Sequence, residues 1–518
     1  MTFMTFNIII PLYSTSSHPH RQQFNQHCFN SSMAAFKLNP PFDHRLQNQS
    51  LINNQTKNNF SLQFKKTVQP FTTTCTTSTS ISKQIENTIS VHDNRRKMLG
   101  PGNWPDMLDP MDPVFRSELI RYGEMAQACY EAFDNNPYSK YCGSCKVPPK
   151  TFFQDLGMDS SGYEITSYIY SSNTSNLIPK FFIKSIDSDG PWNPMVNWIG
   201  YVAVSNDETT TRLGRRDIVI VWRGTVTKLE WMEDLMNFLK PVSAQKLASR
   251  DPNIKVMAGF LHIYTDKDQS CPYSKFSARE QLLAEVTRLT KIYGQKGEKM
   301  SLTITGHSLG SALATLSAYD IAESELDKVD KTQKIPISVI SFSGPRVGNI
   351  RFKKRVEELG IKVLRVFNIH DIVPNVPGVL LNERTSTLVQ RIADWTAFFY
   401  SHIGEELALD HRRSPYMKEK LDFVSMHSLE LLLHLLDGYH GKLESKLWVA
   451  SGRDIALVNK DGDILKHEYL IPPNWLQVEN KGLRKNQKGE WKLPDQRSIE
   501  DHLTPHDVEL HLRKLGLA

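Results

Sequence analysis

The stretch that decides the fold is Leu302–Ala322, LTITGHSLGSALATLSAYDIA. It opens with a short apolar run of β-prone residues, passes through the G-x-S-x-G turn of Gly306–Gly310, and continues into an Ala/Leu-rich run with helical spacing. Strand, tight turn and helix form the context of a nucleophile elbow, whose flanking glycines let strand and helix pass close together. The turn would place Ser308 over a helix N-terminus, where N–H groups suit an oxyanion. We therefore predict that Ser308 is a nucleophile.

The segments around this stretch alternate between strand and helix patterns. The continuous apolar run Ile218–Trp222 is typical of a central strand that is covered on both faces. Further strands are predicted over 163–170, 198–204, 335–342 and 362–367, and helices over 114–133, 278–293 and 505–515. A Leu-rich helix is predicted to open at His427 and to stop at Gly438. This alternation predicts an α/β fold with a mostly parallel, doubly wound sheet. The nucleophile elbow at Gly306–Gly310 fits the α/β-hydrolase fold among such sheets. Beyond it, 446–458 and 464–471 are predicted to form two strands joined by a hairpin turn.

The first 85 residues differ from the rest in composition. They are rich in Ser, Thr, Asn and Gln, and Asp43 is their sole acidic residue against seven Lys and Arg. This pattern is typical of a transit peptide, and the lack of an Arg-rich amphipathic start favours the chloroplast over the mitochondrion. A secretory signal is the weaker interpretation, because the start has no basic residues. No apolar run reaches the length of a membrane span, so we expect a soluble or peripheral mature protein.

Charge and cysteine content narrow the function classes. Residues 86–518 carry equal numbers of acidic and basic side chains, which argues against a nucleic-acid partner. The six cysteines include a lone C-x-x-C pair, Cys142 and Cys145, without the second pair or following histidine of a zinc or haem site. Regulation by redox chemistry at this pair stays open. The Lys460–Asp463 turn lacks the downstream glutamate of a calcium loop. We predict no metal and no cofactor.

A serine nucleophile needs a base, and the base needs a carboxylate to fix its tautomer. Asp371 follows a predicted strand downstream of Ser308, where the acid of this fold belongs, although an aspartate there can also cap a turn. His427 opens a Leu-rich helix, where a loop can present it, and is our predicted base. His434 and His402 remain alternatives, and a mid-helix histidine such as His434 is more often a core residue.

An oxyanion hole requires two N–H groups. Leu309, which follows the nucleophile, should supply one, and Thr225, at the end of the strand Ile218–Trp222, should supply the other. His307 is expected to have a packing role. The segment Thr227–Lys240 is amphipathic, with an apolar face that includes Trp231, Met232, Leu235 and Met236. Its periodicity alone favours a helix packed on the core over a lid that meets lipid.

Several motifs in the same order resemble the class 3 (fungal-type) lipase family. They are WRGT at 222–225, TGHSLG at 305–310, GPRVGN at 344–349 and DIVP at 371–374. The segments YSHIGEEL at 400–407, HSLE at 427–430 and DGYHG at 437–441 are similar to the chloroplast phospholipases A(1) of the anther-dehiscence-defective type. The resemblance covers roughly residues 100–475 and is specific, because separate motifs agree.

This resemblance implies a lipase that releases the sn-1 fatty acid from phosphatidylcholine, plastid galactolipids and sometimes triacylglycerol. It implies that Ser308, Asp371 and His427 form the catalytic triad, that Thr225 serves the oxyanion hole, and that Thr227–Lys240 is a lid. Members of this branch supply linolenate for jasmonate synthesis. The expected location is the chloroplast stroma or the surface of thylakoids or plastoglobules, with peripheral association to membrane lipids.

Four regions follow from these patterns. We predict a transit peptide at 1–85, an extension that packs on the core at 86–195, a hydrolase core at 196–445 and a C-terminal extension at 446–518. Two other functions compete with a lipid hydrolase. One is a lipase-like protein that serves protein interaction, which the complete set of candidate residues disfavours. The other is a soluble carboxylesterase, which the apolar face of Thr227–Lys240 disfavours only modestly.

Overall fold

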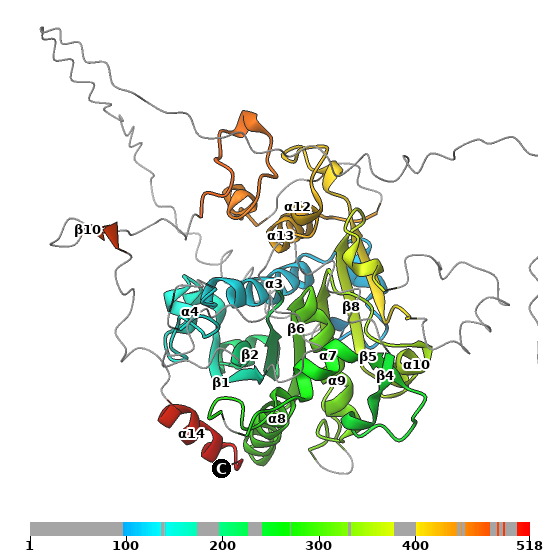
Figure 1. Cartoon of the computed structure of the whole chain (residues 1–518). Helices are drawn as coiled ribbons and strands as arrows, with labels where there is room; N and C mark the ends of the chain where they lie inside the picture. Colours follow the sequence, from blue (N-terminus) through cyan, green and yellow to red (C-terminus); the bar gives the residue numbers. More distant parts are fainter. Residues whose placement is uncertain are drawn as a thin grey trace, which may run out of the picture. The chain divides into compact units, whose positions relative to one another are not determined.

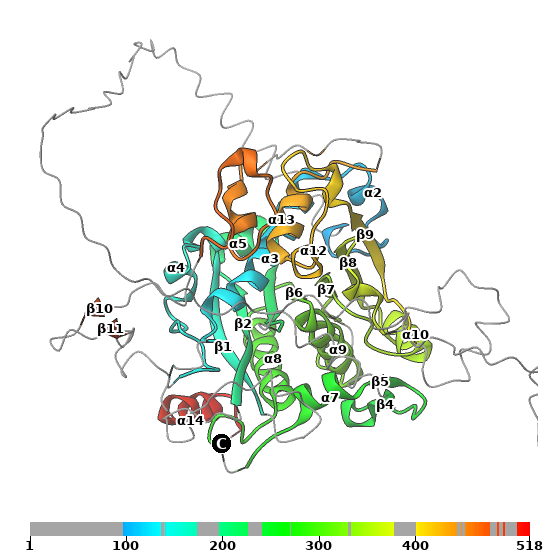
Figure 2. The same ribbon diagram turned by 45° about the horizontal axis from the view of Figure 1, so that its top comes forward.

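The computed structural model describes residues 97–135, 139, 141–172, 196–225, 241–269, 271–329, 333–377, 400–442, 447, 451–476, 484–485, 491–492 and 505–517. The chain divides into two compact units, Met1–Cys75 and Thr76–Ala518. All described residues belong to the second unit, and Figures 1 and 2 show their helices and strands in colour. The predicted transit peptide lies outside them, and the four predicted region boundaries stay predictions.

A seven-stranded sheet forms the centre of the second unit. Its order is β1-β2-β3-β6-β7-β8-β9, with β1, β2 and β3 antiparallel and the strands from β3 to β9 parallel. The strands are β1 (Tyr163–Ser172), β2 (Val196–Ser205), β3 (Arg216–Trp222), β6 (Met300–His307), β7 (Ile337–Phe342), β8 (Lys362–Asn368) and β9 (Glu405–Leu409). The predicted strands of the core and the mostly parallel sheet are confirmed.

Helices cover both faces of this sheet, as the alternation of patterns predicted (Figure 1). Along β3, Val219 and Val221 face one core cluster, whereas Ile218 and Ile220 face the other. Every residue of β3 is buried, because two layers of helix cover it. The first cluster includes α3 (Pro113–Ala132) and α13 (Leu429–Asp437); the second includes α7 (Ala258–Thr265), α8 (Ala278–Gln295), α9 (Leu309–Glu323) and α10 (Ile350–Glu358).

The remaining described elements are short. They are α2 (Pro105–Leu108), α4 (Phe152–Asp155), α5 (Asp207–Leu213), α12 (Phe423–Met426), α14 (Pro505–Lys514), the hairpin of β4 (Pro241–Ser243) with β5 (Lys255–Met257), and the pair β10 (Arg484–Lys485) and β11 (Trp491–Lys492). The 3-10 turns are η1 (Asp159–Ser161), η3 (Ala244–Leu247), η4 (Val373–Asn375), η5 (His411–Arg413), η6 (Ile455–Asn459) and η7 (His467–Tyr469). The predicted C-terminal helix is confirmed as α14.

The two strands predicted over 446–458 and 464–471 are wrong where the structure describes these residues. The backbone here makes one isolated antiparallel bridge, between Leu465 and Met417, and side chains bond other backbone groups. The Asn459 side-chain oxygen accepts hydrogen bonds from the N–H groups of Ile464 and Leu465, both at 2.9 Å, and Asp454 accepts one from Ala456 at 2.8 Å. The apolar side chains of this segment still reach the core, which explains why their spacing suggested strands.

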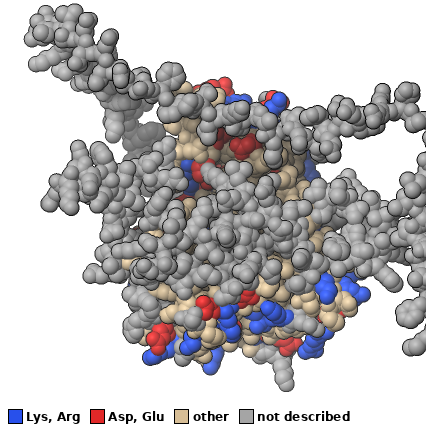
Figure 3. Space-filling model, in the orientation of Figure 1, with Lys and Arg blue, Asp and Glu red and all other residues tan. Residues whose placement is uncertain are grey.

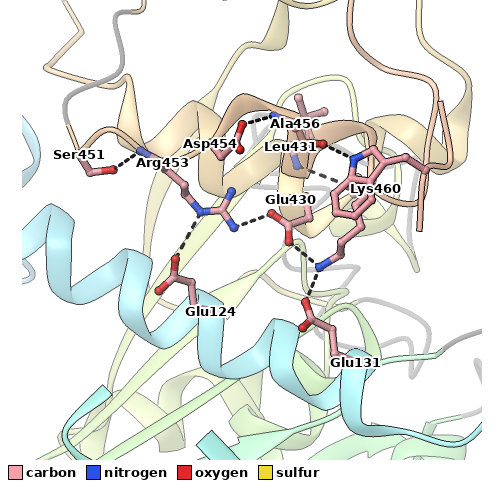
Figure 4. A network of polar contacts seen from close by, with 11 residues as sticks. Glu124, Glu131, Glu430, Leu431, Ser451, Arg453, Asp454, Ala456 and Lys460 are labelled. Carbon is pink, nitrogen blue, oxygen red and sulfur yellow. Dashed lines mark hydrogen bonds and ion pairs between the residues drawn. The ribbon is translucent and has the colours of Figure 1, made fainter. Parts of the chain in front are cut away.

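An ion network around the buried Glu430 fixes this C-terminal segment to two helices (Figure 4). Lys460 pairs with Glu131 of α3 and with Glu430 of α13, the latter at 3.1 Å. Arg453 pairs with the same Glu430 at 2.6 Å and with Glu124 of α3 at 3.4 Å. Buried charges are costly unless they are paired, so the network holds three parts of the chain in one arrangement.

The described surface mixes both signs of charge. Lys and Arg side chains gather near the lower edge of the view in Figure 3, with Asp and Glu between them. Among the described residues, no helix has the length and apolar character that crossing a membrane requires.

Candidate active site

Ser308 lies in a strained turn between β6 and α9. Its backbone has φ 58° and ψ −124°, a region that residues other than glycine rarely occupy. The flanking residues must be glycines, because a side chain at either position would clash with nearby backbone atoms. A Cβ on Gly306 would lie 2.4 Å from the carbonyl carbon of Gly310, and a Cβ on Gly310 would lie 2.2 Å from the carbonyl oxygen of Trp222. The predicted strand, turn and helix are therefore present, with the geometry of a nucleophile elbow.

Neighbouring groups fix this turn. The Ser308 N–H donates to the carbonyl oxygen of Phe342, at the end of β7, at 2.9 Å. The Ser311 hydroxyl donates to the same oxygen at 3.0 Å and to the Gly306 carbonyl at 2.5 Å. Ser308 is the N-cap residue of α9 but makes no side-chain capping bond, so its hydroxyl does not occupy the helix N–H groups. The start of α9 thus has the character of an anion site.

Asp371 and His427 meet at the same edge of the sheet. Asp371 follows the end of β8, and His427 lies between α12 and α13. The Nδ1 of His427 is 2.7 Å from one carboxylate oxygen of Asp371, and the other oxygen accepts the Val373 N–H at 3.0 Å. The Asn368 side chain donates to the Met426 carbonyl at 3.2 Å, which ties the end of β8 to the residue before His427. A carboxylate on Nδ1 leaves Nε2 as the basic nitrogen of a neutral imidazole.

His307 connects this pair to the elbow. Its ring lies 4.6 Å from that of His427, centroid to centroid, and its Nε2 is 2.9 Å from the His427 carbonyl oxygen. Its Nδ1 is 2.7 Å from the hydroxyl of Tyr130. The expected packing role of His307 is therefore incomplete, because both ring nitrogens make hydrogen bonds. Tyr130 was missed by the sequence reasoning, since no motif marks its position on α3.

The two alternative histidines have other partners. The Nε2 of His434 is 3.1 Å from the Ser414 hydroxyl, and burial lowers the pKa of His434 to about 4. His402 lies against the guanidinium groups of Arg346 and Arg365, and burial together with these cations lowers its pKa to about 2. Of the three candidates, His427 is the one that contacts Asp371.

The predicted oxyanion residues lie on adjoining backbone. Leu309 is the first residue of α9, and Gly310 lies against the main chain of Trp222 and Arg223. Thr225 is two residues after Arg223. The four predicted lid residues, Trp231, Met232, Leu235 and Met236, lie outside the described residues.

One cluster near the site has side chains of the kind that bind metals. The ligand atoms of His370, Asp410 and His411 lie within 4.8 Å of one another. However, Arg412 donates to both carboxylate oxygens of Asp410, at 3.2 and 3.1 Å, and so already supplies a cation there. Cys142 and Cys145 are both buried, and the redox role considered for them stays a prediction.

Comparisons with known proteins show the family of the chain. The family described as Lipase (class 3) matches residues 219–381. Phospholipase A1-Igamma2, chloroplastic, of Arabidopsis thaliana is 53% identical over 437 residues, which cover 84% of this chain and 82% of that protein. The chain belongs to this plant family of class 3 lipases. Phospholipase A1-Igamma1, chloroplastic, from the same plant is 53% identical over 82% of each chain. Its Galactolipase DONGLE, chloroplastic, is 43% identical over 61% of this chain and 65% of that protein.

The matched family region does not contain the whole site. Ser308, Asp371, Thr225 and Leu309 lie within residues 219–381, whereas His427 lies beyond them. The candidate base therefore comes from a later part of the chain, which folds back onto the elbow.

Proposed function

We propose that this protein is a lipid acyl hydrolase that uses Ser308, His427 and Asp371 as its catalytic triad. The observation that carries the proposal is the 2.7 Å contact between His427 and Asp371, made at the edge of the sheet where Ser308 is held in a strained elbow. Serine hydrolases combine these three groups on unrelated folds, so their geometry is more informative than the fold itself.

The proposed reaction proceeds through an acyl-enzyme. The Ser308 hydroxyl oxygen attacks the ester carbonyl carbon while His427 Nε2 takes the hydroxyl proton. The N–H groups of Leu309 and Thr225 bind the negative oxygen of the tetrahedral intermediate. His427 then gives its proton to the leaving glycerol oxygen, and the C–O bond breaks. Water attacks the acyl-enzyme in the same way, which releases the fatty acid and restores the Ser308 hydroxyl.

The proposed substrates are polar membrane lipids. The relatives are named phospholipase A1 and galactolipase, which supports phosphatidylcholine and plastid galactolipids as substrates and cleavage at the sn-1 position. Hydrolysis of triacylglycerol and supply of linolenate for jasmonate synthesis stay predictions, as does the lid role of Thr227–Lys240.

The proposed location is the chloroplast. The relatives are labelled chloroplastic, and the first 85 residues have the composition of a transit peptide. A substrate that resides in a bilayer requires the enzyme to reach the membrane surface. We therefore include peripheral association with the surface of thylakoids or plastoglobules, or residence in the stroma, in the proposal.

The test uses the full chain and its Ser308→Ala variant. Both are added to vesicles of phosphatidylcholine and monogalactosyldiacylglycerol that carry different acyl chains at the two glycerol positions, and the released acids are identified. We expect the sn-1 acid from the wild type and none from the variant. A variant with a folded circular-dichroism spectrum serves as the control that the substitution removed the nucleophile alone.

The other outcomes separate the competing functions. A soluble esterase would hydrolyse a short, water-soluble ester, and its rate on a lipid would not increase at the concentration where that lipid aggregates. Release of no acid from any lipid or ester would overturn the enzyme proposal in favour of a protein-interaction role. Release of the sn-2 acid would keep the mechanism and overturn the positional assignment.

A further inference from the structure

His307 is buried between two groups that each bind one of its ring nitrogens. It is the last residue of β6, directly before Ser308, and is 6% exposed. The His427 carbonyl oxygen can only accept a hydrogen bond, so the Nε2 of His307 must carry a proton and donate it at 2.9 Å. Desolvation lowers the pKa of His307 well below its usual value, so the ring is neutral and its Nδ1 is an acceptor.

This tautomer fixes the direction of the next hydrogen bond. The Tyr130 hydroxyl lies 2.7 Å from Nδ1 and must donate to it. The hydroxyl oxygen also lies close to the backbone of Gly224, which acts to lower the pKa of Tyr130. Burial has the larger effect and raises that pKa overall, so the hydroxyl keeps its proton. The Tyr130 hydroxyl thus donates to His307, and His307 donates to the His427 carbonyl.

Gly224 also shows how tightly these groups are packed. A Cβ at this position would lie 1.9 Å from the Tyr130 hydroxyl oxygen and 2.6 Å from the His307 carbonyl oxygen. Gly224 directly precedes Thr225, and His307 directly precedes Ser308. Hydrogen bonds therefore link Tyr130, the residue before the nucleophile and the backbone of the candidate base, and Tyr130 packs against the residue before the candidate oxyanion residue.

We propose that Tyr130 and His307 are positioning residues that fix His427 through its main chain. The proposal rests on the proposed function of His427 as the base. Asp371 holds the imidazole at Nδ1, and the His307 bond holds the carbonyl of the same residue, so ring and backbone are fixed from two sides. Because His307 is neutral, it does not oppose the positive charge that His427 acquires when it takes the Ser308 proton.

The test replaces donors and acceptors without removing volume. Tyr130→Phe deletes the hydroxyl and keeps the ring. His307→Gln keeps an acceptor for Tyr130 and a donor for the His427 carbonyl, whereas His307→Leu removes both. Tyr201→Phe is the matched control, since Tyr201 is a buried tyrosine whose hydroxyl donates to the carbonyl of Met125 on α3 at 2.9 Å, away from this chain of bonds.

Two rates are measured on the full chain and its variants. One is the turnover of vesicle phosphatidylcholine per active site, and the other is the rate at which a p-nitrophenyl alkylphosphonate labels Ser308. The labelling rate reports how well Ser308 is activated, and this assay contains no lipid. We expect Tyr130→Phe and His307→Leu to lower both rates about tenfold or more with KM unchanged, because a misplaced general base loses much of its contribution. We expect His307→Gln and Tyr201→Phe to stay within about threefold of the wild type.

The outcomes separate the two proposals. If Tyr130→Phe and His307→Leu label Ser308 as fast as the wild type does, the positioning role is overturned. Equal losses in His307→Gln and His307→Leu would also overturn it, because they would show a need for the imidazole itself or for its packing. A wild type that labels at Ser308 but hydrolyses no lipid would overturn the proposed function, and the labelling rates would still decide the role of Tyr130 and His307.

Discussion

Stability should fall on acidification because His434 is buried in its neutral form. His434 lies on α13, is 4% exposed and contacts the Ser414 hydroxyl through Nε2, while the ring of Tyr416 packs edge-on against it at 5.6 Å. Burial lowers its pKa to about 4 in the folded protein. In the unfolded chain a histidine has its ordinary pKa of about 6.5.

The sign and size of the effect follow from these two pKa values. Below about pH 6.5, His434 is protonated in the unfolded chain but stays neutral in the folded protein, so acid favours the unfolded state. The contribution of His434 to the free energy of unfolding is fully present above about pH 6.5 and is lost as the pH falls toward 4. At pH 5 the loss from this one group is about 2 kcal/mol, and its limit near pH 4 and below approaches about 3 kcal/mol.

The measurement compares the wild type with His434→Gln. Glutamine can still hydrogen-bond Ser414 but does not titrate. Urea unfolding of both full chains is followed by tryptophan fluorescence at pH 8 and pH 5. The free energy of unfolding of the wild type should fall by about 2 kcal/mol more than that of the variant between these pH values. Other buried histidines, such as His411, are common to both proteins and cancel. Equal falls in the two proteins would refute the reasoning.

Three further predictions test the elbow and the ion network. Ser308→Gly should abolish activity. Its free energy of unfolding in urea should be roughly 1 kcal/mol higher than that of Ser308→Ala, because glycine tolerates the positive φ at this position. Lys460→Met should cost roughly 2 kcal/mol in the same assay, because it leaves Glu131 without this cation and Glu430 with Arg453 alone, whereas the more exposed Lys418→Met should cost under about 1 kcal/mol. Gly310→Ala should prevent folding or lower the melting temperature by more than about 5 °C, whereas Gly157→Ala, with open space around it, should cost about 1 kcal/mol; thermal unfolding checks both.

The sequence predicted best where local pattern and function coincide. The run Leu302–Ala322 contains the strand, the glycines and the helix within one stretch, so its geometry could be predicted without knowledge of distant contacts. The acid was also predictable, because Asp371 follows a strand end and the strand order of the fold then determines its edge of the sheet. Both predictions use only short-range spacing and the general topology of the fold.

Prediction was weaker where long-range packing decides the outcome. His427 and His434 lie on the same short segment, and only the folded chain shows that the first contacts Asp371 and the second Ser414. Tyr130 could not be predicted, because it lies 177 residues from His307 and a tyrosine on an amphipathic helix is most often a core residue. The wrong strands over 446–458 and 464–471 have a related cause. The Asn459 side chain bonds the N–H groups of Ile464 and Leu465, and the pairing of Leu465 with Met417 stays a single bridge.

The candidate base is held by contacts from inside and from outside residues 219–381, the region that the family model matches. Asn368 binds the carbonyl before His427, His307 binds the carbonyl of His427 itself, and Lys460 binds Glu430 three residues later. These contacts come from β8, from the elbow and from the C-terminal segment, so the loop that presents His427 is fixed by three separate parts of the fold. A loop fixed in this way has few alternative arrangements, which is the condition for a general base to stay within reach of its nucleophile. The parts of the chain outside residues 219–381 therefore contribute to the candidate site by restricting where its histidine can lie.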